Sequence, residues 1–252
     1  QDTWDALNQD TLRPLTNRAL QGTYPPGSTF KIAMAVAALE EGIVTPSFRV
    51  SCRGGGTFYG RFSECHTTHG SVDMREALEQ SCNTYFYTLG EMLEIDQIHK
   101  WATALGLGEL SGLDLPHEVQ GLIPSTAWKR EARGEPWYSG ETISVAIGQG
   151  AVSVTPISMA VMMATVTNGG TRVTPHLLKA VNDGTGWTPW QPPGPQSEVS
   201  LSATTLSTVT DGLWYVVNRV GTGRRGRIEG RDVIGKTGTA QVISLQGRIA
   251  AG

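Results

Sequence analysis

The sequence carries little charge, and this argues against a nucleic-acid partner. Charged residues make up 17% of the 252 residues, and the net charge is −3 at pH 7, whereas an average soluble domain has about 25% charged residues. Domains that bind nucleic acid usually carry a basic excess on one face. We therefore expect no nucleic-acid partner for this chain.

Long apolar segments are also missing. The longest uninterrupted apolar run covers residues 32–39, far short of the roughly 20 residues that cross a membrane. No basic-then-apolar leader opens the chain, and residues 1–4 resemble the middle of a protein. We therefore expect a fragment of a longer protein, whose anchor is not included.

Glycine and aromatic residues are plentiful and indicate a folded domain with many loops. The chain has 31 Gly, 13 Pro and 7% aromatic residues, a composition that disfavours disorder. Residues 51–70 look irregular, and residues 182–197 look like a linker. Apolar and polar residues alternate weakly at positions 142–147, and residues 232–235 and 240–243 fit the two ends of one strand. Periodicity and end signals predict helices at residues 28–42, 72–79, 95–105, 157–166 and 201–220, so we expect an α+β arrangement.

Ser28 and Lys31 form an S-x-x-K pattern at the start of a predicted helix. Positions i and i+3 share a helix face, so the hydroxyl and the amine can meet. A serine becomes nucleophilic when a neighbouring base takes its proton, and a lysine is such a base only when its pKa is lowered. The apolar neighbours of Lys31 favour its burial. Alone, the pattern is more typical of an N-cap serine and an exposed lysine.

Ser81-Cys82-Asn83 is a second short polar pattern. Alternate residues of an extended segment point the same way, so Ser81 and Asn83 are expected to share a cleft while Cys82 points away. The hydroxyl would relay a proton, and the amide would hold a peptide bond. On its own, this pattern is more typical of an ordinary polar turn.

The third pattern is Lys236-Thr237-Gly238-Thr239, between two β-branched runs. A cation and a hydroxyl on one strand face suit an anionic group such as a carboxylate. Gly238 lets a ligand approach the backbone closely, and the N–H groups of Thr239 and Ser28 would form an oxyanion hole. A strand edge with a turn is the alternative for this segment taken alone.

In this order, the three patterns are the signature of penicillin-binding proteins and class A β-lactamases. With the flanking Y-P-P-G-S-T-F-K and G-K-T-G-T-A-Q, nearly the whole chain resembles the transpeptidase domain of class B penicillin-binding proteins. The segment P-W-Y before residues 148–150 is similar to the penicillin-binding protein 2 branch, which works in side-wall elongation. The resemblance implies an α+β transpeptidase fold like that of serine β-lactamases, with an antiparallel sheet flanked by helices and a mainly helical lobe.

The resemblance also implies a peptidoglycan D,D-transpeptidase that crosslinks stem peptides and is acylated by β-lactams. Ser28 would form the acyl-enzyme, and Lys31 would be the base for acylation. Ser81 would pass a proton to the leaving amine, and Asn83 would hold the peptide backbone. These four residues are the expected catalytic set.

The same resemblance assigns substrate binding to the K-T-G-T segment. Lys236 and Thr237 would receive the terminal carboxylate, and Gly238 and Thr239 would complete the segment. None of this chemistry needs a cofactor. Residues 1–252 would be a single transpeptidase domain without its anchor, pedestal and last strands. The full protein would lie on the outer face of the cytoplasmic membrane, with a membrane glycan polymerase and elongation-complex proteins as partners.

Cys52, Cys65, His69 and Cys82 are a donor set suited to a structural zinc ion. The odd number of cysteines would leave one thiol outside a disulfide framework, and some members of the resembled branch carry a metal in this segment. One alternative is a Cys52–Cys65 disulfide, with Cys82 a buried thiol. Another is His66 as ligand in place of His69. We favour zinc over the disulfide, and we favour His69 because its T-H-G setting is similar to a G-H-G of that branch.

Other activities share the three patterns. A serine β-lactamase or a D,D-carboxypeptidase would deacylate with water, and a β-lactam sensor would acylate and signal. A class A β-lactamase needs a glutamate-based water site, and we find no convincing E-x-x-x-N pattern between Asn83 and Lys236. We therefore favour the transpeptidase.

Overall fold

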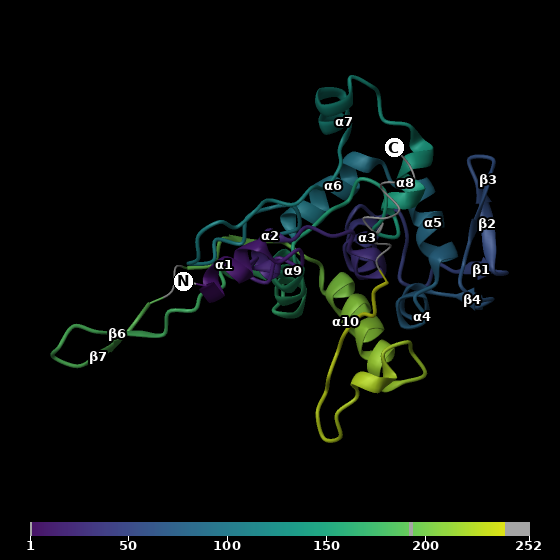
Figure 1. The fold of residues 1–252 in the computed structure, drawn as a ribbon. Helices are drawn as coiled ribbons and strands as arrows, with labels where there is room; N and C mark the ends of the chain where they lie inside the picture. Colours follow the sequence, from purple (N-terminus) through teal and green to yellow (C-terminus); the bar gives the residue numbers. More distant parts are fainter. Residues whose placement is uncertain (1, 192–193, 240–252) are drawn as a thin grey trace.

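The computed structural model describes residues 2–191 and 194–239, in which helices predominate (Figure 1). The α-helices are α1 (Asp2–Gln9), α2 (Arg18–Gln21), α3 (Lys31–Glu40), α4 (Met74–Glu79), α5 (Asn83–Met92), α6 (Ile95–Ala104), α7 (Thr126–Arg133), α8 (Ser139–Val145), α9 (Pro156–Thr167) and α10 (Ala203–Asn218). Two 3-10 turns are η1 (Gly27–Phe30) and η2 (Arg224–Gly226). The helices predicted at residues 95–105, 157–166 and 201–220 are confirmed.

The described strands form two-stranded antiparallel sheets. The strands are β1 (Val50–Cys52), β2 (Gly55–Phe58), β3 (Arg61–Glu64), β4 (Gly70–Val72), β5 (Thr171–Arg172), β6 (Ala180–Asn182), β7 (Trp187–Pro189) and β8 (Ser197–Glu198). The pairs are β1 with β4, β2 with β3, β5 with β8, and β6 with β7. Helices with antiparallel pairs confirm the α+β class.

Helix α3 is the centre of the core. It lies between α6 and α10 in Figure 1, and it contacts α4 and α5 as well. Every residue from Lys31 to Ala38 is buried, as expected for a helix that is apolar on all sides. Its first residue, Lys31, is therefore a cation inside the core. The predicted helix at 28–42 is right in position, but its first turn is the 3-10 turn η1.

Helix α4 is fixed at both its start and its side. Asp73 caps its N-terminus in a capping box with Glu76, and Arg49 forms ion pairs with both carboxylates. Helix α10 packs closely on α4, because a Cβ at Gly212 would lie only 2.7 Å from Leu78 Cδ1. The turn that follows α4, which carries Ser81, thus starts from a firmly held helix.

Residues 51–70 are more ordered than the sequence suggested. Strands β2 and β3 form a hairpin, and Cys52 of β1 pairs with Gly70 of β4. The hairpin turns at Tyr59 and Gly60, whose φ values are +48° and +77°. Positive φ at both central residues is typical of the tight turn that suits the strand twist. The prediction of an irregular excursion is therefore wrong.

Two further expectations need correction. Residues 142–147 belong largely to α8, where Glu141 accepts a hydrogen bond from the Tyr138 backbone N–H and caps the helix. Residues 232–235 form no strand among the described residues. Their backbone groups form hydrogen bonds with α10 instead: Gly235 N–H donates to Leu213 O, and Asn218 Nδ2 donates to Val233 O. Residues 240–243 lie outside the described residues.

Residues 182–197 contain parts of strands rather than a plain linker. They include the last residue of β6, the whole of β7, and the first residue of β8. The hairpin of β6 and β7 projects from the helical body (Figure 1). Within the described residues, no helix is long and apolar enough to cross a membrane.

We expect Gly148→Ala to destabilise the domain more than Gly42→Ala. Both glycines have positive φ, +69° and +64°, which costs an alanine roughly 1–2 kcal/mol. Of the two, only Gly148 is crowded: the Cβ of an alanine there would lie 2.8 Å from Gly27 N and 2.8 Å from Phe30 Cβ. Chemical unfolding of the two variants would measure the difference in free energy of unfolding. Equal losses would contradict the close contact between residues 148 and 27.

Candidate active site

Lys31 lies at the centre of the site and has no exposed surface. Its Nζ donates hydrogen bonds to Ser81 O at 2.8 Å, Ser81 Oγ at 3.2 Å and Asn83 Oδ1 at 2.6 Å. Three acceptors match the three donors of an ammonium group. The ring of Phe86 lies 5.4 Å from Nζ. These contacts join the start of α3 to the turn between α4 and α5.

Burial changes the acid–base behaviour of Lys31. Loss of solvation lowers the pKa of Lys31 from 10.5 to about 8, and the negative charge of Cys65 opposes this shift. Burial disfavours the charged form of a lysine. A substantial fraction of the amine is therefore neutral at mildly alkaline pH, as a proton acceptor must be.

Ser28 lies in η1, directly before α3, and is half-buried. The backbone N–H of Gly27 donates to Gly148 O at 2.9 Å and fixes this turn. The hydrogen bonds of Lys31 Nζ go to Ser81 and Asn83 rather than to Ser28 Oγ. The i, i+3 spacing thus places hydroxyl and amine on neighbouring turns without a direct hydrogen bond.

A cleft of about 580 Å³ brings the three sequence patterns together. It is lined by Ser28, His66, Ser81, Asn83, Ile147, Gln149, Thr222, Thr237 and Thr239. Sequence reasoning did not predict His66, Ile147, Gln149 and Thr222 as cleft residues, and it considered His66 only as an alternative metal ligand. The G-Q-G turn around Gln149 was a usable signal, whereas the setting of Thr222 between two glycines carried none.

The turn after α4 presents Ser81 and Asn83 to the cleft, as predicted. Ser81 has a φ of +54°, a conformation that is uncommon outside glycine. Its N–H donates to Leu78 O, and the Cys82 N–H donates to Ala77 O. Cys82 is fully buried on the other side. Ser81 and Asn83 therefore share the cleft as expected, although the segment is a turn leading into α5 and not an extended one.

The K-T-G-T segment lies beside the turn that carries Ser28. A Cβ at Gly238 would meet Thr29 Cγ2 at 2.9 Å, so a larger residue there would displace the Thr29 side chain. Lys236 is half-buried, and its Nζ donates to Thr237 O at 3.2 Å. Burial lowers the pKa of Lys236 to about 7, and the charge of Lys31 acts in the same direction. An anionic ligand here would restore the charge of Lys236.

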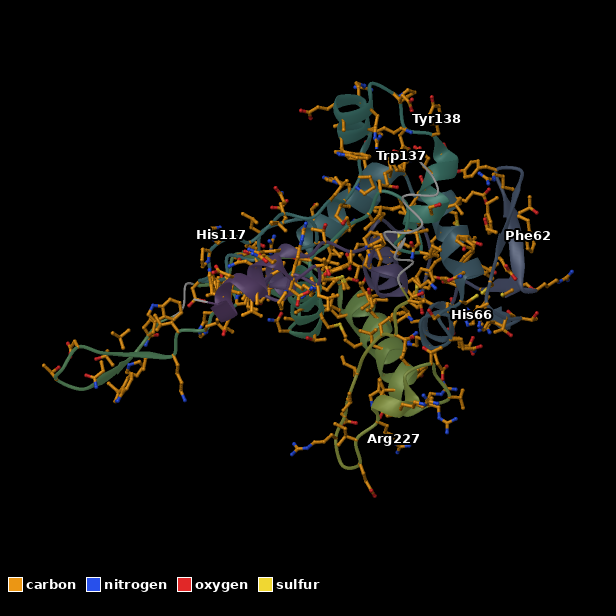
Figure 2. All side chains as sticks on the ribbon, in the orientation of Figure 1. Phe62, His66, His117, Trp137, Tyr138 and Arg227 are labelled. Atoms are coloured by element: carbon orange, nitrogen blue, oxygen red, sulfur yellow. The ribbon has the colours of Figure 1, made fainter. Side chains whose placement is uncertain are left out.

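Behind the cleft, the side chains of Cys52, Cys65, His69 and Cys82 form a cluster. Their sulfur and nitrogen atoms all lie within 4.8 Å of one another, and His69 Nδ1 is 3.5 Å from the sulfurs of both Cys52 and Cys65. All three cysteines are free thiols, so the alternative Cys52–Cys65 disulfide is not formed. Figure 2 shows His66 beside this cluster, and its Nδ1 reaches Cys65 Sγ only at 3.9 Å.

The thiol of Cys65 has the character of a metal ligand. Hydrogen bonds from Cys82 and from backbone N–H groups, including that of Asn83 at 3.2 Å, hold the pKa of Cys65 below its usual value, against the effect of burial. The bond to Cys65 and burial together raise the pKa of Cys82. Metal ions bind the thiolate rather than the thiol.

Comparison with known proteins identifies the family. The sequence matches the family described as the penicillin binding protein transpeptidase domain over residues 2–251. The chain belongs to this family. Peptidoglycan D,D-transpeptidase MrdA of Acinetobacter baumannii is 39% identical over 248 residues, which cover 96% of this chain and 36% of that protein.

Solved structures of penicillin-binding proteins share this fold. Pseudomonas aeruginosa PBP2 in complex with WCK 5153 is 38% identical with a TM-score of 0.87, covering 96% of this chain and 53% of that one. Helicobacter pylori PBP2 in complex with MreC is 29% identical with a TM-score of 0.83, covering 96% and 44%. This penicillin-binding protein chain thus spans about a third to a half of the length of these relatives.

Proposed function

We propose that this chain is the acyl-transfer domain of a peptidoglycan D,D-transpeptidase. The observation that carries the proposal is the buried Lys31 amine, bonded to Ser81 and Asn83 in the cleft that Ser28 and Thr237 also line. The nucleophile and the anion-binding hydroxyl thus line one cavity, and the buried base is hydrogen-bonded to two further residues of its lining, as acyl transfer requires. The relatives named D,D-transpeptidase MrdA support the same activity.

The first half-reaction attaches the donor to Ser28. Ser28 Oγ attacks the carbonyl between the two terminal D-alanines while Lys31, in its neutral form, accepts the hydroxyl proton. The N–H groups of Ser28 and Thr239 stabilise the developing oxyanion. The hydrogen bond between Lys31 Nζ and Ser81 Oγ gives the proton a path to the leaving D-alanine amine.

The substrate is held at both ends of the cleft. Asn83 binds the peptide backbone with the amide N–H group that its bond to Lys31 leaves unused. Lys236 and Thr237 donate hydrogen bonds to the terminal carboxylate. An amine from a neighbouring stem peptide then attacks the acyl-enzyme and gives the 4→3 crosslink. In β-lactams, the strained amide takes the place of the D-alanyl-D-alanine bond.

Slow hydrolysis of the acyl-enzyme separates this function from that of a β-lactamase. Among the described residues that line the cleft, none carries a carboxylate. A class A β-lactamase uses a glutamate with a conserved water for deacylation. The cleft therefore favours a long-lived acyl-enzyme that waits for an amine.

We place the full protein on the outer face of the cytoplasmic membrane, where stem peptides are crosslinked. Its partners would be a membrane glycan polymerase and elongation-complex proteins. The relative from Helicobacter pylori, which was solved in complex with MreC, supports this assignment. The whole set of described residues would act as a single domain of that longer protein.

We further propose that Cys52, Cys65, His69 and Cys82 hold a structural zinc ion. Bonds of about 2.3 Å to sulfur in a tetrahedral site imply ligand separations of about 3.8 Å, and the cluster's separations of up to 4.8 Å come near this value. The ion would be coordinated by all four side chains and would take no part in the acyl-transfer reaction. Because Cys82 lies between Ser81 and Asn83, its fixation would orient both of these side chains.

We expect penicillin to form one stable adduct at Ser28. Opening of the lactam ring releases no leaving group, so the intact mass of the protein should rise by the full mass of one penicillin. Ser28→Ala should form none, and Ser47→Ala, at an exposed serine outside the cleft, should react like the original chain. Hydrolysed penicillin without a lasting adduct would favour a β-lactamase instead.

The rate of acylation should rise with pH, with an apparent pKa of about 8. Lys31 has a pKa of about 8 instead of 10.5, and only its neutral form accepts the proton. Asn83→Asp would put a carboxylate beside Nζ, raise the pKa of Lys31 and move the inflection to higher pH. First-order acylation rates at saturating penicillin between pH 6 and 10 would test this, because the bound carboxylate keeps Lys236 charged under those conditions. A flat profile would argue against Lys31 as the base.

Purified protein should contain about one zinc ion per chain. Cys82→Ser should lower the zinc content and the unfolding temperature, since the site would lose one of its four ligands. His66→Ala is the matched control and should keep its zinc, because His66 lies outside the cluster. Mass spectrometry of the native protein would measure the metal content. An equal loss in both variants would point to a different ligand set.

A further inference from the structure

Thr222 places a second hydroxyl beside the anion-binding end of the cleft. Its Oγ1 lies 2.6 Å from Thr237 Oγ1, and both residues line the cleft. Thr222 belongs to none of the three sequence patterns. It follows α10 in the loop that leads to the K-T-G-T segment, and it is separated from Thr237 by 15 positions.

The position of Thr222 is fixed by the end of α4. Its N–H donates to Glu79 O at 3.2 Å, and its hydroxyl lies 3.4 Å from the same oxygen. Glu79 is 1% exposed, and its Oε1 accepts a hydrogen bond from Val220 N–H at 3.2 Å. Arg219 approaches the same carboxylate at 3.9 Å. This loop is thus bonded to a residue only two positions before Ser81.

The glycine before Thr222 lets the loop lie against α10. A Cβ at Gly221 would come within 2.5 Å of Val216 Cα, so a larger residue does not fit. The backbone hydrogen bond to Glu79 and the close packing of Gly221 on α10 hold the backbone of Thr222 in place. Its side chain is thereby directed toward Thr237. Its contact with Thr237 is therefore built into the fold.

The two hydroxyls can share their protons in two ways. Each hydroxyl has one proton to donate and can accept from others. In one arrangement, Thr237 donates to Thr222, which donates to Glu79 O. In the other, Thr222 donates to Thr237, and the proton of Thr237 is free. A carboxylate only accepts hydrogen bonds. Binding of a substrate carboxylate beside Thr237 therefore selects the second arrangement.

We propose that Thr222 is a positioning residue for the donor's carboxylate: its hydroxyl donates to Thr237 Oγ1 and directs the proton of Thr237 to the ligand. This inference rests on the proposed transpeptidase function. Thr222 acts through Thr237 and contributes to recognition of the donor's charged end. It also links that end to the turn that holds Ser81, because both are bonded to the end of α4.

The test compares acylation by a penicillin and by its methyl ester, which lacks the carboxylate. Thr222→Val keeps the shape of the side chain and removes the hydroxyl. It should lower the second-order acylation rate for the penicillin about tenfold, as expected for a hydrogen bond to a charged ligand. The rate for the ester should change little. Thr222→Ser keeps the hydroxyl and should restore most of the rate for the penicillin.

A double-mutant cycle separates this role from a general structural one. In a Thr237→Val background, Thr222→Val should have almost no further effect, because the two residues act as one unit. Thermal unfolding checks that the variants fold. If Thr222→Val does not fold, Thr222→Ala replaces it as a variant without the hydroxyl.

Three results would overturn the inference. They are an unchanged rate for the penicillin in Thr222→Val, an equal loss for penicillin and ester, and an undiminished effect in the Thr237→Val background. If the original chain is not acylated at Ser28, the proposed function fails and the inference fails with it. An acylated chain that is insensitive to Thr222→Val overturns the inference alone.

Discussion

The buried ammonium of Lys31 is the interaction on which the arrangement of the cleft depends. A cation without exposed surface needs a hydrogen-bond acceptor for each donor, because an unpaired buried charge is strongly destabilising. Ser81 and Asn83 supply those acceptors. The core helix α3 and the turn after α4 are therefore held in one geometry. The same burial lowers the pKa of Lys31 to about 8, so the packing that orders the site also favours the neutral amine that the proposed base requires.

Much of this site could be predicted from the sequence, because its chemistry is carried by short local patterns. The apolar neighbours of Lys31 indicated burial, and the alternation in Ser81-Cys82-Asn83 indicated which residues face the cleft. Spacing alone did not give the partners of Lys31 Nζ, which lie about 50 positions away. Those contacts depend on the packing of α3 against α5, which no local pattern specifies.

The errors in the fold have identifiable physical causes. Weak alternation at residues 142–147 was overridden by the capping contact of Glu141, which starts α8. The predicted strand at residues 232–235 would need a neighbouring strand, and its backbone bonds to α10 instead. The ordered hairpin at residues 55–64 depends on the positive φ of Tyr59, which a tyrosine seldom adopts and the sequence therefore did not suggest.

The turn at residues 81–83 is held from three directions, and this explains how a site built from distant segments keeps its geometry. Lys31 bonds it from the core, Cys82 ties it to the cysteine and histidine cluster, and Glu79 connects it to the loop that holds Thr237. The proposed acyl transfer needs groups that are already in place before the substrate binds, because reorganisation would cost activation energy. The turn is thus contacted from the core helix, from the cysteine and histidine cluster and, through Glu79, from the loop after α10. The unfavourable φ of Ser81 is kept because these contacts together outweigh it.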